Sequence, residues 1–83
     1  MNPIRYAGVI AFVDWISRTH PEVQSLRDTP KAQFLLLATE YEASKGKKID
    51  KNHQLYRKWE STHMVFTHNA SDEKALAELR SFS

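Results

Sequence analysis

The chain has 83 residues, a formal net charge of +2, a 41% share of hydrophobic residues and an 11% share of aromatic residues. A chain of this length has room for one domain and a compact core, because it buries only about 60% of the surface that its unfolded form exposes. The near-balanced charge excludes a chain that binds nucleic acid over its whole surface, and the hydrophobic share excludes a disordered chain.

The sequence has no cysteine, which excludes disulfides, thiolate metal sites and cysteine nucleophiles. Secreted domains of this size usually depend on disulfides, so the composition favours a cytoplasmic protein. The apolar run 7–13 is interrupted by Asp14 and Arg18, and no small-residue cleavage pattern follows, so we interpret it as a helix rather than a signal peptide. No apolar run approaches the roughly 20 residues of a membrane span, and we expect no membrane association.

The first predicted helix begins at Asn2 as N-cap with Pro3 in the first helical position, and ends before Pro21. Apolar residues surround most of this helix instead of forming one stripe. Such a helix is expected to be buried on nearly every side, as the central helix of the fold, or to offer a spare face to another chain. These residues are Ile4, Val9, Ile10, Phe12, Val13, Trp15 and Ile16.

A short helical turn is predicted over residues 22–27, with Val23 and Leu26 pointing inward. A second long helix is predicted to begin with Thr29 as N-cap and Pro30 in the first helical position, and to end near Ser44. Its inward face is predicted from helical spacing, its outer side carries two glutamates, and Gly46 is a natural residue to end it. The inward residues are Phe34, Leu35, Leu37, Ala38 and Tyr41, with Leu36 widening the stripe, and the outer ones are Glu40 and Glu42.

A third helix is predicted from Lys51 to about His68, with Asp50 as N-cap and with Leu55 and Trp59 anchored in the core. Residues 63–67 are rich in β-branched and aromatic side chains, but a single strand would have no partner, so they are interpreted as helical. Ser71 is predicted to cap a last helix over residues 72–82. The fold class is therefore all-α, a small compact bundle of about four helices in a single helical domain, residues 1–83.

The stretch 45–58 contains six basic residues and one acidic residue, a local charge of +5, so the rest of the chain sums to −3. One interpretation is a helix end complemented by cations and followed by a solvated loop. The other is contact with phosphates, in which loop 46–49 would be the turn of a helix-turn-helix. Once the residues assigned to the helix end and to the core are removed, the candidate partner-binding set is Lys47, Lys48, Lys51, Asn52, Tyr56, Arg57 and Lys58.

No motif in the chain predicts catalysis, a metal site or a cofactor. Glu60 and His63 have the Glu-x-x-His spacing of helix-bundle metal sites, but those sites need a second such pair and two further glutamates. Ser61 and His63 are two residues apart on a helix and point to different sides, so they do not form a nucleophile and its base. We expect a protein that is not an enzyme.

The sequence therefore predicts a small non-catalytic binding or regulatory protein of the adaptor or inhibitor type. It would act through protein–protein interaction, and self-association into a homo-oligomer is the simplest form of that function. The alternative is a helix-turn-helix-like module that binds DNA or RNA through the basic stretch 45–58.

Overall fold

A computed structural model describes residues 7–81 of the chain, and these residues form four α-helices without a strand. The helices are α1 (Ala7–Thr19), α2 (Lys31–Ser44), α3 (Gln54–His68) and α4 (Asp72–Ser81). The predicted all-α class, a small compact bundle of about four helices, is confirmed. The predicted helix start at Asn2 and Pro3, and the predicted end of the last helix at Phe82, lie outside the described residues.

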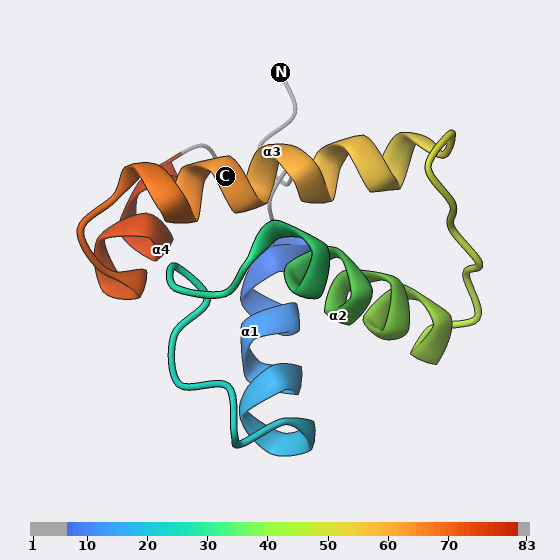
Figure 1. Cartoon of the computed structure of the whole chain (residues 1–83), viewed down its shortest axis with the longest axis horizontal. Helices are drawn as coiled ribbons and strands as arrows, with labels where there is room; N and C mark the ends of the chain where they lie inside the picture. The colour runs from blue at the N-terminus through green and yellow to red at the C-terminus, as the bar shows by residue number, and fades with distance from the viewer. Residues whose placement is uncertain (1–6, 82–83) are drawn as a thin grey trace.

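Helix α3 runs along the long dimension of the molecule, and α2 lies beside it in the opposite direction (Figure 1). Residues 45–53 join these two helices at one end of the molecule, and α4 folds back at the other end of α3. Helix α1 crosses below them at a steep angle and contacts α2 and α4. None of the helices within residues 7–81 has both the length and the apolar character needed to cross a bilayer.

All four helices contribute to one hydrophobic core, whose centre is aromatic. The ring of Phe12 lies 4.6 Å from the Trp59 ring, 5.4 Å from Tyr41 and 5.6 Å from Phe34, measured between ring centroids. Phe34 continues the cluster to Phe66 at 5.9 Å. Tilted and edge-to-face aromatic pairs stabilise by about 0.5–1.5 kcal/mol beyond the area they bury, so this cluster holds α1, α2 and α3 together.

The prediction that the first helix is buried on nearly every side is wrong for the described residues. Val9, Phe12 and Ile16 are buried, but Ala11 and Asp14 belong to an exposed outer face. On that face Arg18 pairs with Asp14 at 3.1 Å, the expected i,i+4 ion pair. The helix that lies between two neighbours along its length is α3, which packs against α2 on one side and α4 on the other.

The connection 20–30 is not helical, so the predicted turn of helix over residues 22–27 does not form. Leu26 is nevertheless buried and Val23 packs against the core, as predicted. A carboxylate of α4 holds this connection: Asp72 accepts hydrogen bonds from the backbone N–H groups of Leu26 and Arg27, both at 2.7 Å. It also accepts one from the Ser25 hydroxyl at 3.2 Å.

Helix α2 begins one residue later than predicted, and Thr29 is not its N-cap. Pro30 occupies that position without a side-chain cap, while the Thr29 hydroxyl donates to the Ser25 carbonyl at 2.7 Å. The other end matches the prediction, because Gly46 adopts φ 82° just past the helix. The N–H groups of Gly46 and Lys47 donate to the Ala43 and Glu42 carbonyls at 2.9 Å, the pattern of a Schellman motif.

Helix α3 begins at Gln54, three residues later than predicted, and its N-cap is His53 instead of Asp50. The Asp50 carboxylate accepts from the Asn52 N–H at 2.9 Å and so stabilises a turn, and the His53 ring nitrogen Nδ1 accepts from the Leu55 N–H at 3.1 Å. The predicted continuation of this helix through residues 63–68 is confirmed. Ser71 caps α4 as predicted, accepting from the Lys74 N–H at 3.2 Å.

His20 fixes the end of α1 to the outer side of α2. Its ring contacts the Glu40 carboxylate at 2.7 Å and the Glu22 carboxylate at 3.0 Å. These hydrogen bonds, first to Glu40 and then to Glu22, raise the pKa of His20. The protonated ring can donate from both nitrogens, so the bridge favours the charged form of the histidine.

Candidate functional site

The predicted partner-binding residues lie on the connection 45–53 and on the first turn and a half of α3. Ile49 is the buried anchor of this connection and fixes its path, while the residues on either side of it face solvent. The connection is longer than the turn of about three or four residues in a helix-turn-helix. The predicted loop 46–49 is therefore only part of the connection, and the start of α3 lies farther along the chain.

Four of the predicted cations are exposed and have no carboxylate partner within residues 7–81. Every ion pair among those residues involves other basic groups, such as Lys31 with Glu60 and Lys45 with Glu42. Exposed and unpaired cations keep their full capacity to meet an anionic partner. They are Lys47, Lys48, Lys51 and Arg57, and Asn52 is exposed beside them.

The structure does not bring the predicted set together on one surface. Tyr56 and Lys58 are two residues apart on α3, and since each helical residue is rotated by about 100°, their side chains leave on opposite flanks. Tyr56 and Lys51 line a groove against α2. Lys58 lies on the other flank, where a Cβ added to Gly8 of α1 would come within 3.4 Å of its amino group.

The flank that carries Lys58 is built around a buried carboxylate. Glu42, predicted to lie on the outer side of its helix, is only 2% exposed. Its Oε2 accepts a hydrogen bond from the Trp59 indole at 2.8 Å, and Lys45 Nζ lies 3.5 Å from its Oε1. The prediction for Glu42 is wrong because a tryptophan N–H in the core needs an acceptor, and this carboxylate is one turn from the helix end.

Lys58 completes this charged cluster. Its amino group lies 5.4 Å from the centroid of the Trp59 ring, within the range of a cation–π contact. Burial lowers the pKa of Lys58; the nearby Glu42 carboxylate opposes this effect, and the charges of Lys45 and Lys47 add to it. The cluster therefore has a structural part to play in joining α1, α2 and α3, and Lys58 is not a freely accessible contact for a partner.

The groove between α2 and α3 is the strongest candidate site. It consists of two adjoining hollows, of about 530 Å³ and 260 Å³, that share Ala32, Leu35, Lys51 and Tyr56. Leu36 forms part of the wall and is 70% exposed, the larger of the two exposed fractions among the big apolar side chains of residues 7–81. An exposed leucine beside an aromatic ring and a cation resembles the centre of a protein-binding surface.

The walls of the groove are apolar, and its rim is charged. Thr39 donates its hydroxyl to the Leu35 carbonyl at 2.8 Å, so its hydrogen-bonding capacity is already used within α2. At one end Lys31 Nζ pairs with Glu60 Oε2 at 3.3 Å. The cation of Lys51 lies on the rim without such a partner. Recognition here would depend on apolar contact along the walls and on charge at the rim.

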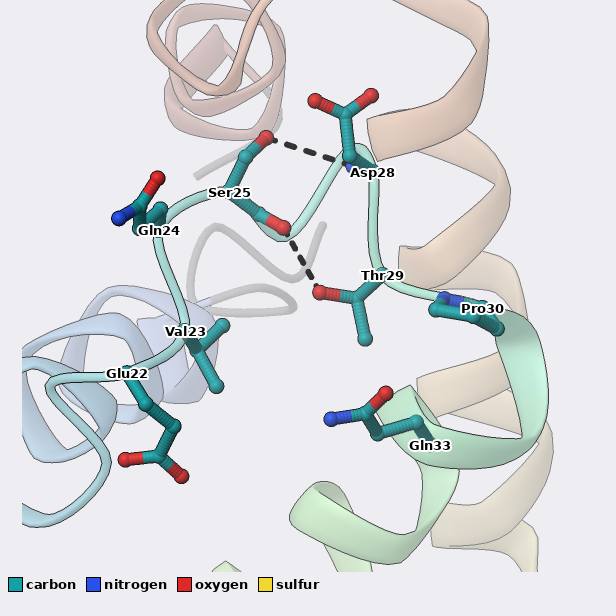
Figure 2. Close-up of a pocket in the computed structure, with 8 residues that line it drawn as sticks. All are labelled: Glu22, Val23, Gln24, Ser25, Asp28, Thr29, Pro30 and Gln33. Carbon is teal, nitrogen blue, oxygen red and sulfur yellow. Dashed lines mark hydrogen bonds between the residues drawn. The ribbon is translucent and has the colours of Figure 1, made fainter.

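A third hollow, of about 330 Å³, lies between the connection 20–30 and the start of α2 (Figure 2). Its polar groups are largely paired with one another. Ser25 accepts from the Asp28 N–H at 3.4 Å and Glu22 binds His20, which, after the backbone N–H of Glu22 itself, lowers the Glu22 pKa. Asp28 pairs with Arg27 at 2.9 Å. None of the predicted site residues lies here, and the hollow offers few free groups to a ligand.

The two members of the Glu-x-x-His pair have separate partners. The His63 ring donates through Nε2 to the Thr29 carbonyl at 3.0 Å, since a carbonyl can only accept, and the residue is 8% exposed. Glu60 instead pairs with Lys31. Within residues 7–81, no group of three or more histidine or acidic side chains is arranged to hold a metal ion.

Sequence reasoning missed Leu36 as a site residue, although a signal was present. Phe34, Leu35, Leu36 and Leu37 are four consecutive apolar residues, and four consecutive helical positions cover nearly the whole circumference of a helix. One of them had to face away from the core. The direction opposite to Phe34 and Ala38 is that of Leu36.

Comparison of this chain with protein-family models, with curated proteins and with solved structures finds no match. The function is therefore argued from the groove and its rim.

Proposed function

We propose that this protein is a small non-catalytic binding protein that recognises a protein partner through the groove between α2 and α3. The observation that carries the proposal is Leu36, 70% exposed on the wall of a groove that also contains Tyr56 and Lys51. Keeping a leucine in water forgoes the roughly 1.5–3 kcal/mol that its burial provides, so a partner that covers it gains that free energy on binding.

The proposal extends to the type of protein and to its location. A short chain with one exposed groove suits an adaptor or an inhibitor, which needs one recognition surface and no reaction centre. A homo-oligomer formed through the same surface is one form of this function. We place the protein in the cytoplasm because a secreted domain of this size usually depends on disulfides, and the sequence has no cysteine.

Replacing Leu36 with glutamate tests the proposal. The substitution is expected to abolish capture of the partner from a lysate of the source organism, because it places a charge against the apolar surface of that partner. Stability should change by no more than about 0.5 kcal/mol, since the position is exposed and glutamate is a good helix former. The measurement is affinity capture on immobilised protein, with thermal unfolding followed by circular dichroism.

Ala11→Glu is the matched control, because Ala11 is exposed on the outer face of α1, away from the groove. The partner should be retained by the unmodified protein and by Ala11→Glu, and lost from Leu36→Glu. Sedimentation velocity over a range of concentrations separates self-association from capture of a different protein. A partner that binds all three proteins equally would show that the groove is not the recognition site.

The second candidate function is nucleic-acid binding, favoured by the exposed and unpaired cations Lys47, Lys48, Lys51 and Arg57. Under this alternative a generic duplex should bind, and the affinity should fall steeply as salt rises. Charge reversal of Lys47, Lys48 and Lys51 should abolish binding, and neutralising three phosphate contacts should lower the salt slope by about 3. Fluorescence anisotropy at low and at high salt measures both effects, and absence of duplex binding at low salt removes the alternative.

A further inference from the structure

We infer that the occupant of the groove between α2 and α3 is an acidic amphipathic helix of a partner protein. This inference rests on the proposed function and adds the chemistry of the partner. The walls define the apolar face of the occupant, and the unpaired cations at the rim define its charge.

The apolar surface has the shape that a helix requires. On α2 it follows Ala32, Leu36 and Thr39, which are spaced four and three residues apart and therefore lie on one side of that helix. Exposed Ala43 continues the line, so the surface extends over about 16 Å of α2 at 1.5 Å per residue. An amphipathic helix with apolar residues at i, i+3 or i+4, and i+7 covers such a length in about three turns.

Tyr56 forms the opposite wall of the groove. Its ring is only half-buried and packs against the core on one side, so the other side remains available for contact. Aromatic side chains beside exposed aliphatic ones are typical anchor positions of interfaces. A helix lying between Leu36 and Tyr56 would therefore contact both α2 and α3.

The charge of the rim favours an acidic occupant. The two acids nearby are already engaged, Glu60 with Lys31 and Asp50 with the Asn52 N–H. Lys51 on the rim and Arg57, one residue beyond Tyr56, have no carboxylate partner within residues 7–81. Carboxylates flanking the apolar face of the partner would supply that missing charge.

The same charge argues against a second copy of this chain as the occupant. A twofold interface places each patch against its own counterpart, so the unpaired cations of one copy would face those of the other. Like charges across an interface oppose association. The groove therefore fits a different protein better than it fits itself.

Selection from a displayed library of random 16-residue peptides tests the inference, with the full 83-residue chain immobilised. The enriched peptides are expected to carry apolar residues at i, i+3 or i+4, and i+7, and to contain more Asp and Glu than Lys and Arg. They should not be enriched on Leu36→Glu. For the most enriched peptide, labelled for anisotropy, Lys51→Glu should weaken binding by about tenfold, the equivalent of about 1.4 kcal/mol.

Lys74→Glu is the matched control for charge, because Lys74 is an exposed lysine on α4, and it should leave the affinity unchanged. A peptide in which the acidic residues are replaced by lysine should bind Lys51→Glu more tightly than it binds the unmodified protein. That exchange of preference requires the two charges to be close together, which a general loss of stability would not produce.

The outcomes separate this inference from the proposed function. Enriched peptides that need Leu36 but are basic or uncharged overturn the acidic partner and leave protein recognition by the groove intact. Peptides that bind Leu36→Glu equally well overturn both. A dimer in solution that Leu36→Glu dissociates, or duplex binding that Lys51→Glu abolishes in a protein that enriches no peptide, also overturns the acidic partner.

Discussion

Replacing Trp59 with alanine is expected to lower the free energy of unfolding by about 3–5 kcal/mol. Trp59 is fully buried and contacts Phe12, Phe34 and Tyr41, so its removal leaves a cavity where three helices meet. A domain of this length has a total stability of only about 4–12 kcal/mol, so the variant should be largely unfolded or close to it. Urea unfolding followed by far-ultraviolet circular dichroism measures the change.

Trp59→Phe tests the hydrogen bond separately from the packing. It preserves an aromatic ring but removes the donor to Glu42, and it leaves a buried carboxylate without its hydrogen bond at a cost of about 1–3 kcal/mol. Glu42→Gln should then cost less in the Trp59→Phe protein than in the unmodified one, because the two residues are coupled. Additive effects of the two substitutions would contradict the stabilising role assigned to this bond.

Replacing Asp72 with alanine is expected to destabilise the protein by about 2–4 kcal/mol, because hydrogen bonds to a charged group contribute more than neutral ones. The carboxylate accepts from Leu26 N–H, Arg27 N–H and the Ser25 hydroxyl, and alanine would leave all three donors without an acceptor. Hydrogen exchange should show the Leu26 and Arg27 amides losing protection, while urea unfolding gives the total change.

Glu73→Ala is the matched control for Asp72→Ala. Glu73 is an exposed acid in the same first turn of α4, so it shares the favourable interaction with the helix N-terminus, which contributes about 0.3–1 kcal/mol. Its replacement should cost no more than that and should leave the exchange of Leu26 and Arg27 unchanged. Equal losses from the two substitutions would mean that Asp72 acts only through the charge of the first helical turn.

The sequence predicted the helices better than their ends. Hydrophobic spacing located α2, α3 and α4 because a helix must bury one side, and that requirement is written in local order. The starts of α2 and α3 were misplaced because Thr29 and Asp50, both good N-cap residues, form hydrogen bonds elsewhere. His53 caps α3 instead, and histidine is not among the residues that usually signal a helix start.

The candidate site was predicted in part. Lys51 and Tyr56 were identified from composition alone, and both line the groove. Lys58 belongs to the opposite flank, because a basic run in sequence becomes two surfaces when part of it is wound into a helix. The burial of Glu42 could not be predicted, since it depends on Trp59, seventeen residues away, approaching from another helix.

The contact between Asp72 and the connection 20–30 also has a consequence for the order of folding. It joins residues 46 positions apart, so the chain between Leu26 and Asp72 forms a ring that encloses the whole of α2 and α3. Closing a flexible loop of that length costs about 3 kcal/mol of chain entropy, comparable to the free energy that the contact provides. The ring therefore closes once the packing of α2 on α3 has already brought its ends together, and it then limits how far the finished bundle can open.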